Sequence, residues 1–229
     1  MSGTRAVAIV LAAGAGRRLG AEIPKAFLSI GDRPMLSVAV AAAAASPAIG
    51  AVVVTAPAGY EDTARLCVEG LEVPCTVVTG GPTRQASVRE ALVALGDDVD
   101  VVAIHDAARP FAPPDLFTAV VEAVVGGVEG AVPVLSIMDT VKRVDVDLVV
   151  GTEERSGLAL AQTPQAFPLE TLRAAHAQAE ADGVDVTDDA MLLEGSGKVV
   201  TVPGDPGNLK ITTMLDLAHA EARMSGPGD

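Results

Sequence analysis

Short apolar runs recur along the chain and alternate with segments of helical pattern. The runs cover residues 7–11, 51–55, 76–79, 101–104 and 130–134. They are continuously apolar rather than alternating, which is typical of parallel strands buried on both faces. The order of strands and helices therefore predicts an α/β fold, doubly wound around a mostly parallel sheet.

Helix boundaries are marked by proline, glycine and capping residues. We predict helices over residues 34–46, 83–95 and 115–125, with Thr83 as an N-cap and Pro47 as a stop. Beyond Pro168 we expect a helix to about residue 182, a capped segment from Thr187, a strand over 198–202 and a final helix over 212–223.

The pattern changes near residue 139. Residues 139–150 and 158–162 alternate polar and apolar positions around a polar turn at 152–156, and no helix intervenes. We predict two antiparallel strands that project as a β-arm over about 138–162. A second subunit would cover the arm's apolar face, so we expect a homodimer; the alternative is an arm folded back on its own sheet. The chain otherwise forms a single domain, residues 1–229, with a disordered tail at about 225–229.

Composition narrows the class of protein. Hydrophobic residues make up 49% of the 229 positions and mean hydropathy is +0.40, but no apolar run approaches the ~20 residues of a membrane helix. Because no targeting signal is apparent, we expect a cytoplasmic location. Cys67 and Cys75 match no common zinc spacing, which favours reduced structural thiols.

The net charge of −14 argues against a nucleic-acid partner, which requires a basic face. An anionic ligand would have to rely on local clusters of cations. Such a cluster follows the first apolar run, in the sequence Leu-Ala-Ala-Gly-Ala-Gly-Arg-Arg-Leu-Gly-Ala-Glu-Ile-Pro-Lys over 11–25. Glycine lets backbone N–H groups approach an anion, and Arg17, Arg18 and Lys25 would neutralise it, so the segment indicates a polyphosphate site.

A dinucleotide-binding loop is the alternative interpretation of these glycines. Gly14, Gly16 and Gly20 loosely resemble G-x-G-x-x-G, but three residues separate the second and third. The next strand is followed by Thr55-Ala-Pro, without the carboxylate that would bind a ribose. A loop around a nucleoside triphosphate accounts better for the three cations.

Two further segments carry candidate chemistry. Asp106 ends an apolar strand, where ligands bind in parallel sheets, and its carboxylate suits Mg²⁺; the alternative is an ion pair with Arg109 or a turn cap. His105 points to the opposite face and is interpreted as a hydrogen-bonded core histidine. Gly80 and Gly81 open a helix and would host a base edge or a phosphate, although the loop alone is an ordinary cap.

Six motifs taken together resemble the 2-C-methyl-D-erythritol 4-phosphate cytidylyltransferases, from about residue 7 to about residue 217. They are Leu11-Ala-Ala-Gly-x-Gly-Arg-Arg, Pro24-Lys25, His105-Asp-Ala-Ala-Arg-Pro110, Gln162-Thr-Pro-Gln165, Thr187-Asp-Asp-Ala190 and Asn208-Leu-Lys-Ile211. The resemblance implies transfer of CMP from CTP to 2-C-methyl-D-erythritol 4-phosphate, with release of pyrophosphate and Mg²⁺ or another divalent cation as cofactor. The attacking oxygen belongs to the substrate phosphate and needs charge relief rather than a base.

The resemblance also implies roles for individual residues. Arg18 and Lys25 would stabilise charge at the α-phosphate, Lys210 would be a second positioning cation, and Thr140 and Arg155 would reach the acceptor phosphate in the partner subunit's site. The nucleotide would be held by Ala12, Ala13, Gly14, Gly81, Ser87, Asp106, Ala107 and Arg109, with Asp106 also the metal ligand.

Pro82 departs from the acidic residue that some family members carry, so cytosine recognition would rest on backbone and Ser87. The alternatives are a cytidylyltransferase for another polyol phosphate such as ribitol 5-phosphate, a nucleotidyltransferase that uses another nucleoside triphosphate, and a non-catalytic nucleotide-binding module.

Overall fold

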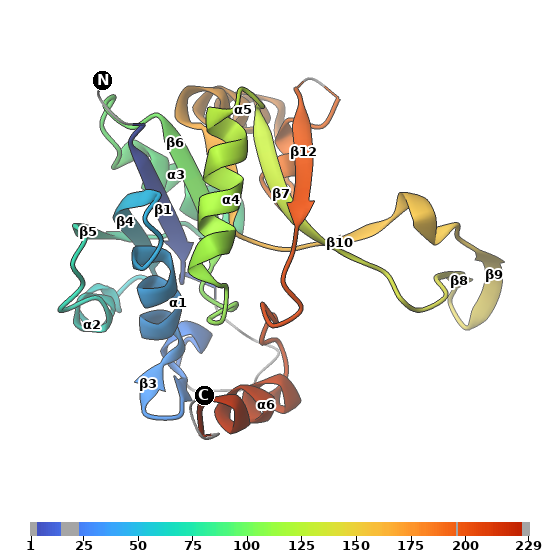
Figure 1. Ribbon diagram of the computed structural model, residues 1–229, viewed down its shortest axis with the longest axis horizontal. Helices are drawn as coiled ribbons and strands as arrows, with labels where there is room; N and C mark the ends of the chain where they lie inside the picture. The colour runs from blue at the N-terminus through green and yellow to red at the C-terminus, as the bar shows by residue number, and fades with distance from the viewer. Residues whose placement is uncertain (1–3, 15–22, 196, 226–229) are drawn as a thin grey trace.

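The computed structural model describes residues 4–14, 23–195 and 197–225, and its centre is a mixed sheet (Figure 1). The strand order is β10-β7-β11-β6-β1-β4-β5, with β12 paired to β7. The parallel part consists of β1 (Ala6–Leu11), β4 (Ile49–Ala56), β5 (Cys75–Thr79) and β6 (Val101–Asp106). The predicted α/β fold with a mostly parallel sheet is confirmed.

The other side of the sheet contains the antiparallel strands. β11 (Gln165–Pro168) runs antiparallel to β6 and to β7 (Gly130–Ser136), and β10 (Ala159–Ala161) runs antiparallel to β7. β12 (Val199–Pro203) adds to β7 in parallel. β11 is a short strand that was not predicted; it begins at Gln165, the last residue of the Gln162-Thr-Pro-Gln165 motif.

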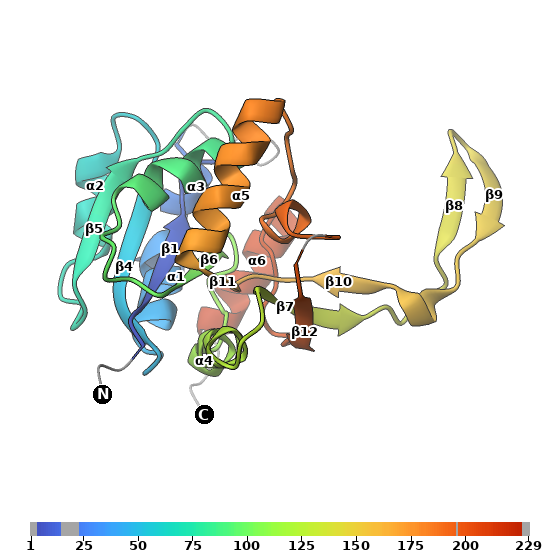
Figure 2. The same ribbon diagram turned by 90° about the horizontal axis from the view of Figure 1, so that it is seen from above.

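Helices cover both faces of the sheet, as Figure 2 shows from above. α1 (Met35–Ala44) and α4 (Pro114–Val125) pack with Ala8 and Val10 of β1, whereas α3 (Arg84–Val93) and α5 (Leu169–Asp182) pack with Val7 and Ile9. Successive side chains of a strand point to opposite faces, so an uninterrupted apolar run supplies both cores.

The predicted capping signals are present. The Thr83 hydroxyl accepts the N–H of Ala86 at 3.0 Å, a proline opens α4, and α5 ends at Gly183 with φ 66°. The sequence analysis did not predict α2 (Glu61–Cys67), which packs beside β5.

Small elements complete the chain around the sheet. They are the strands β2 (Ser29–Ile30) and β3 (Arg33–Pro34), the 3₁₀ turns η2 (Lys25–Phe27), η3 (Arg155–Gly157) and η4 (Ala190–Leu192), and α6 (Met214–Ser225). α6 docks through Leu217 and Ala220 onto Ile30, Met35 and Ile211 in a third apolar cluster. This cluster anchors the segment that precedes α6, which carries Lys210.

The β-arm projects from the sheet and does not fold back on it (Figures 1 and 2). Its tip is a hairpin of β8 (Lys142–Asp145) and β9 (Leu148–Thr152). One expectation is therefore wrong: residues 139–150 are not a single strand. The chain reverses at Val146, where φ is 51°, and the polar–apolar alternation continues through the turn without a glycine or asparagine to mark it.

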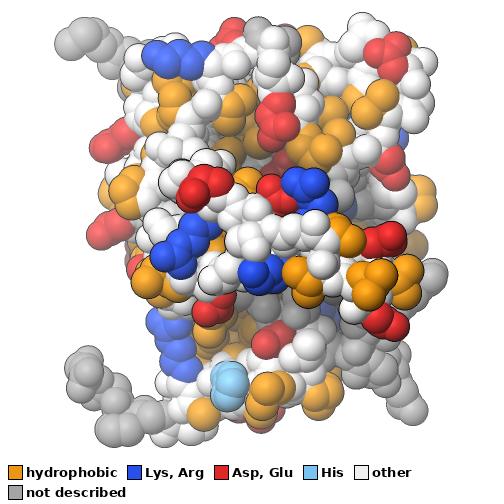
Figure 3. Space-filling model, turned by 90° about the vertical axis from the view of Figure 1, so that its right-hand side faces the viewer, with side chains coloured by type: hydrophobic (Ala, Val, Ile, Leu, Met, Phe, Trp, Pro, Cys, Tyr) orange, Lys and Arg blue, Asp and Glu red, His pale blue; other side chains and the backbone are white. Residues whose placement is uncertain are grey.

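The arm leaves apolar side chains exposed. Val144, Leu148 and Val149 are 61–69% exposed. Figure 3, seen from the side of the arm, shows hydrophobic, basic and acidic side chains next to one another on this surface. Among the described residues, none forms a layer that covers these three side chains.

The two cysteines and the lengths of the helices can be compared with what the sequence predicts. Cys67 and Cys75 are free and half-buried, and burial raises the pKa of the Cys75 thiol to about 11. None of the helices in the described ranges has the length and apolar character to cross a bilayer.

Phe117 is the large side chain on α4 that is fully buried against the sheet, where its ring lies 5.0 Å from that of His105. We expect Phe117→Ala to lower the free energy of unfolding by about 3–5 kcal/mol, because it leaves a cavity in the core. Val125→Ala, on the exposed side of the same helix, should change it by less than about 0.5 kcal/mol. Urea titrations measure both; similar losses would contradict this assignment of the core.

Candidate active site

A cavity of about 620 Å³ opens at the carboxyl ends of the parallel strands. Residues that follow β1, β4 and β5 line it together with the end of β6, because parallel strands deliver their following loops to one edge. The predicted site residues that line it are Ala12, Ala13, Gly14, Lys25, Gly81, Ser87, Asp106, Ala107 and Lys210. The tertiary structure thus brings together segments from both ends of the sequence.

Close packing shapes the wall formed by the loop after β5. A Cβ on Gly80 would lie 2.3 Å from the Ala13 Cβ, and one on Gly81 would lie 2.4 Å from the Ala86 Cβ. The Ser87 hydroxyl contacts the carbonyl oxygens of Thr83 at 2.9 Å and Gly81 at 3.3 Å. Glycine at these positions therefore lets two loops meet, and Ser87 holds one of them in shape.

Asp106 lies between two cations. Its Oδ1 accepts from Arg84 Nε at 3.2 Å and its Oδ2 accepts from Lys210 Nζ at 2.7 Å. Burial alone would raise the pKa of Asp106, but Arg84 and Lys210 outweigh burial and hold it well below the ordinary carboxyl range. The predicted alternative, an ion pair with Arg109, is not what the structure shows.

Arg84 links Asp106 to a second buried carboxylate. Its Nη1 donates to Asp189 Oδ2 at 2.7 Å, and Asp189 Oδ1 lies 3.0 Å from His176 Nε2. Burial alone would raise the pKa of Asp189, but His176 and Arg84 keep it below its usual value. The sequence analysis missed Arg84, Asp189 and His176 as site residues. Asp189 lies in the Thr187-Asp-Asp-Ala190 motif, whereas Arg84 follows the predicted N-cap Thr83, and 105 positions separate the two residues in the sequence.

His105 is a fully buried core histidine, as predicted. Its Nε2 lies 3.0 Å from the Arg109 carbonyl, which requires Nε2 to carry the proton. Its Nδ1 then accepts from the Thr163 hydroxyl at 3.1 Å, and that hydroxyl accepts the N–H of Asp106 at 3.1 Å. The neutral ring therefore fixes the backbone at Asp106.

Anchors on both sides place Lys210 beside Asp106. Asn208 is buried and its Nδ2 donates to the Thr163 carbonyl at 2.9 Å, and the N–H of Ile211 donates to the Ala108 carbonyl at 2.8 Å. Lys210 lies between these anchors and its side chain faces Asp106.

Arg109 lies outside the cavity lining. Its Nη1 donates to the Asn208 carbonyl at 2.8 Å and its Nη2 to the Ala161 carbonyl at 3.2 Å. Arg109 thus ties the base of the arm to the Lys210 segment. This arrangement differs from the expected position beside the ribose.

The arm residues and one loop cation are not part of this cavity. Thr140 and Arg155 are exposed on the arm, where Arg155 Nη1 donates to the Met138 carbonyl, and neither residue lines the cavity of its own chain. Arg18 lies outside the described residues.

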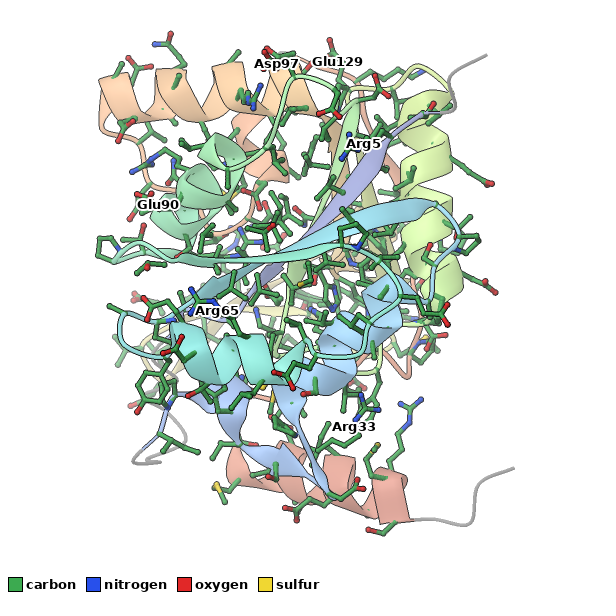
Figure 4. The ribbon with its side chains drawn as sticks, turned by 90° about the vertical axis from the view of Figure 1, so that its left-hand side faces the viewer. Arg5, Arg33, Arg65, Glu90, Asp97 and Glu129 are labelled. Atoms are coloured by element: carbon green, nitrogen blue, oxygen red, sulfur yellow. The ribbon has the colours of Figure 1, made fainter. Side chains whose placement is uncertain are left out.

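The opposite end of the sheet carries a separate set of charges. Figure 4 shows Arg5, Asp97 and Glu129 at the end of the molecule away from α6. The Arg5 N–H donates to Asp100 at 2.8 Å, and Asp97 pairs with Arg173 at 3.3 Å. These contacts fasten strand and helix ends and are remote from the cavity.

An open cavity with glycine-rich walls and cations from distant segments suits a nucleotide and a second phosphate, and together with this fold it defines the class of nucleotidyltransferases. The family model for 2-C-methyl-D-erythritol 4-phosphate cytidylyltransferase, IspD, matches residues 6–226. The chain belongs to this family.

Relatives and solved structures agree with the match. The chain is 48% identical over 218 residues to the 2-C-methyl-D-erythritol 4-phosphate cytidylyltransferase of Rhodococcus jostii, covering 94% of this chain and 93% of the relative. It is 44% identical to that of Frankia casuarinae, covering 96% and 82%. The crystal structure of the Thermus thermophilus enzyme superposes with a TM-score of 0.78 at 34% identity, covering 94% and 97%.

The buried His105 gives the protein a defined response to acid. Burial lowers the pKa of His105 to about 4 from an ordinary value of 6.5, so the unfolded chain binds this proton first as pH falls. We expect the free energy of unfolding to drop by about 3 kcal/mol between pH 6.5 and pH 4 from this group alone. In His105→Gln the slope over that range should be correspondingly shallower; equal slopes in urea titrations of the two proteins would contradict this.

Proposed function

We propose that this chain transfers the cytidylyl group of CTP to 2-C-methyl-D-erythritol 4-phosphate and releases pyrophosphate. The observation that carries the proposal is the convergence of Lys25, Asp106 and Lys210 on one cavity, in a chain that belongs to this family. The family match does not favour another polyol phosphate as acceptor. Release of pyrophosphate from CTP, with each acceptor supplied separately, tests the assignment; a preference for ribitol 5-phosphate would overturn it.

Cations rather than a base are what the reaction needs from the protein. The acceptor phosphate oxygen is already an anion near neutral pH, so the main costs are the approach of two anions and charge at the α-phosphate. In the proposal Arg18 and Lys25 relieve the charge at the α-phosphate, and Lys210 aligns the reacting groups. Lys210 is held beside Asp106 by a 2.7 Å contact, which supports a preorganised site.

The nucleotide is proposed to be bound mainly through contacts with the protein backbone. Ala12, Ala13 and Gly14 follow β1, and Gly81 lines the same cavity. Small side chains at these positions and at Ala107 leave room for a pyrimidine and a ribose. Because the Ser87 hydroxyl already contacts two loop carbonyls, its contribution to cytosine recognition includes holding the Gly80–Gly81 loop in place.

A divalent cation, proposed to be Mg²⁺, fits Asp106 together with the triphosphate. Mg²⁺ is usually bound by one or two carboxylates plus substrate phosphates, and within the described ranges no group of three or more His, Cys, Asp or Glu residues forms a separate site. When bound, the metal would neutralise phosphate charge. Both Asp106 oxygens accept from cations here, so a directly bound metal would replace one of these contacts.

The arm is proposed to act in a homodimer in the cytoplasm. Its exposed apolar residues suit a second copy of the chain as cover, which also supports the proposal that Thr140 and Arg155 serve the partner subunit's site. Both residues lie away from their own cavity, which is consistent with action in trans.

Lys25→Ala tests the role of the loop cation. We expect kcat to fall by roughly 10²-fold or more, with a smaller effect on the KM for CTP, because a contact made chiefly in the transition state is lost. Lys198→Ala, next to the start of β12 at the opposite end of the sheet, is the matched control and should retain wild-type kinetics. A raised KM for CTP with unchanged kcat would make Lys25 a binding residue only.

Arg155→Ala tests the role of the arm. We expect the KM for the acceptor to rise while the KM for CTP stays close to wild type. Arg143→Ala, another arm cation that pairs with Glu153, is the control.

Mixed dimers with Lys25→Ala in one subunit and Arg155→Ala in the other distinguish action in cis from action in trans. Action in trans places both defects in one of the two sites and leaves the other site intact. The mixed dimer should therefore keep about half of the wild-type activity. If the mixed dimer is no more active than the Lys25→Ala and Arg155→Ala homodimers, action in trans is contradicted.

A further inference from the structure

Arg84 is shared by two carboxylates that face it from different parts of the fold. Its Nε contacts Asp106 at 3.2 Å, at the end of β6, and its Nη1 contacts Asp189 at 2.7 Å, just before η4. Lys210 contacts the other oxygen of Asp106 at 2.7 Å. Among these four side chains, two carboxylates therefore face two cations.

The two cations differ in their freedom to leave Asp106. The side chain of Lys210 is 43% exposed and can turn to a substrate phosphate, whereas that of Arg84 is 25% exposed. The Asp189 side chain is fully buried at 0% exposure. If a divalent cation binds Asp106, Arg84 loses its contact with Asp106 and keeps its contact with Asp189. Without Asp189, Arg84 would become an unpaired, largely buried cation, which is costly.

The surroundings of Asp189 keep it in place for this purpose. His176 Nε2 lies 3.0 Å from Oδ1, the oxygen that does not contact Arg84. The next residue is fixed too, because the N–H of Ala190 donates to Gln165 Oε1 at 3.3 Å. These contacts hold the Asp189 carboxylate next to Arg84, at a position that does not line the cavity.

We propose that Asp189 is a positioning residue: it serves as the permanent counter-ion of Arg84 and thereby frees Asp106 to exchange its protein cations for the divalent cation that accompanies CTP. This inference rests on the proposed function and on the proposed metal. It assigns a task to a carboxylate that does not line the cavity itself.

Calorimetric titration of CTP, with Mg²⁺ and with a chelator, measures this exchange without turnover. For the wild type, the ratio of the metal-free to the metal-supported Kd reports how well Asp106 accepts the cation. In Asp189→Asn, Arg84 has Asp106 as its sole carboxylate, so we expect that ratio to fall at least tenfold. Metal-free binding of CTP should be equal or tighter, because the site gains a net positive charge.

Two companion variants separate this role from a structural one. Asp188→Asn removes the adjacent carboxylate, which contacts Gln165 at 2.9 Å and does not pair with Arg84, and it should keep the wild-type ratio. The double variant Arg84→Gln/Asp189→Asn removes both members of the pair, releases Asp106 from Arg84 and should restore most of the ratio. It also provides the test if Asp189→Asn does not fold.

A wild-type ratio in Asp189→Asn, an equal loss of both affinities, or no recovery in the double variant would overturn the inference. Absence of CTP turnover in the wild type would instead contradict the proposed function. The two failures are therefore distinguishable.

Discussion

The site depends on the parallel pairing of β1 with its two neighbours. Leu11 is in register with Asp106 of β6 on one side and with Thr55 of β4 on the other. Because all three strands end at the same level, their following loops open onto one edge, where the cavity forms. The pairing is secured by burial on both faces, since alternate residues of β1 enter the two separate apolar cores.

The cavity at this edge of the sheet contains a local cluster of cations, although the protein as a whole is strongly acidic. The protein has a net charge of −14, yet Lys25, Arg84 and Lys210 line one cavity, and Arg84 and Lys210 both contact the carboxylate of Asp106. Polar contacts hold these groups from behind: His105 and Thr163 fix the backbone of Asp106, and Asn208 anchors the segment that carries Lys210. Cations held close to the cavity by the protein lower the cost of bringing an anionic substrate to this acidic chain.

The arm and the site are physically connected. Arg109 bonds to carbonyls in the base of the arm and in the Lys210 segment, and the Gln162 side chain donates to the carbonyl of Asp205 at 2.9 Å. These contacts tie the base of the arm to the residues flanking Lys210. These contacts give Arg109 a role that differs from the one expected from its motif, although both roles place it beside the site.

The sequence by itself determined the parallel core, the ends of several helices and most of the cavity lining, because these depend on local signals. Continuous apolar runs mark buried strands, Thr83 marks the start of a helix, and glycine beside cations indicates an anion site. Two local features were not predicted: the turn at Val146 contains no glycine or asparagine, and β11 is a four-residue strand that includes a glutamine and a proline. Only the tertiary structure decided which charges meet, since Arg84 and Asp189 are 105 positions apart and Asp106 and Lys210 are 104 apart. Periodicity reports which face of an element is buried, but ion pairs between elements depend on how those elements pack.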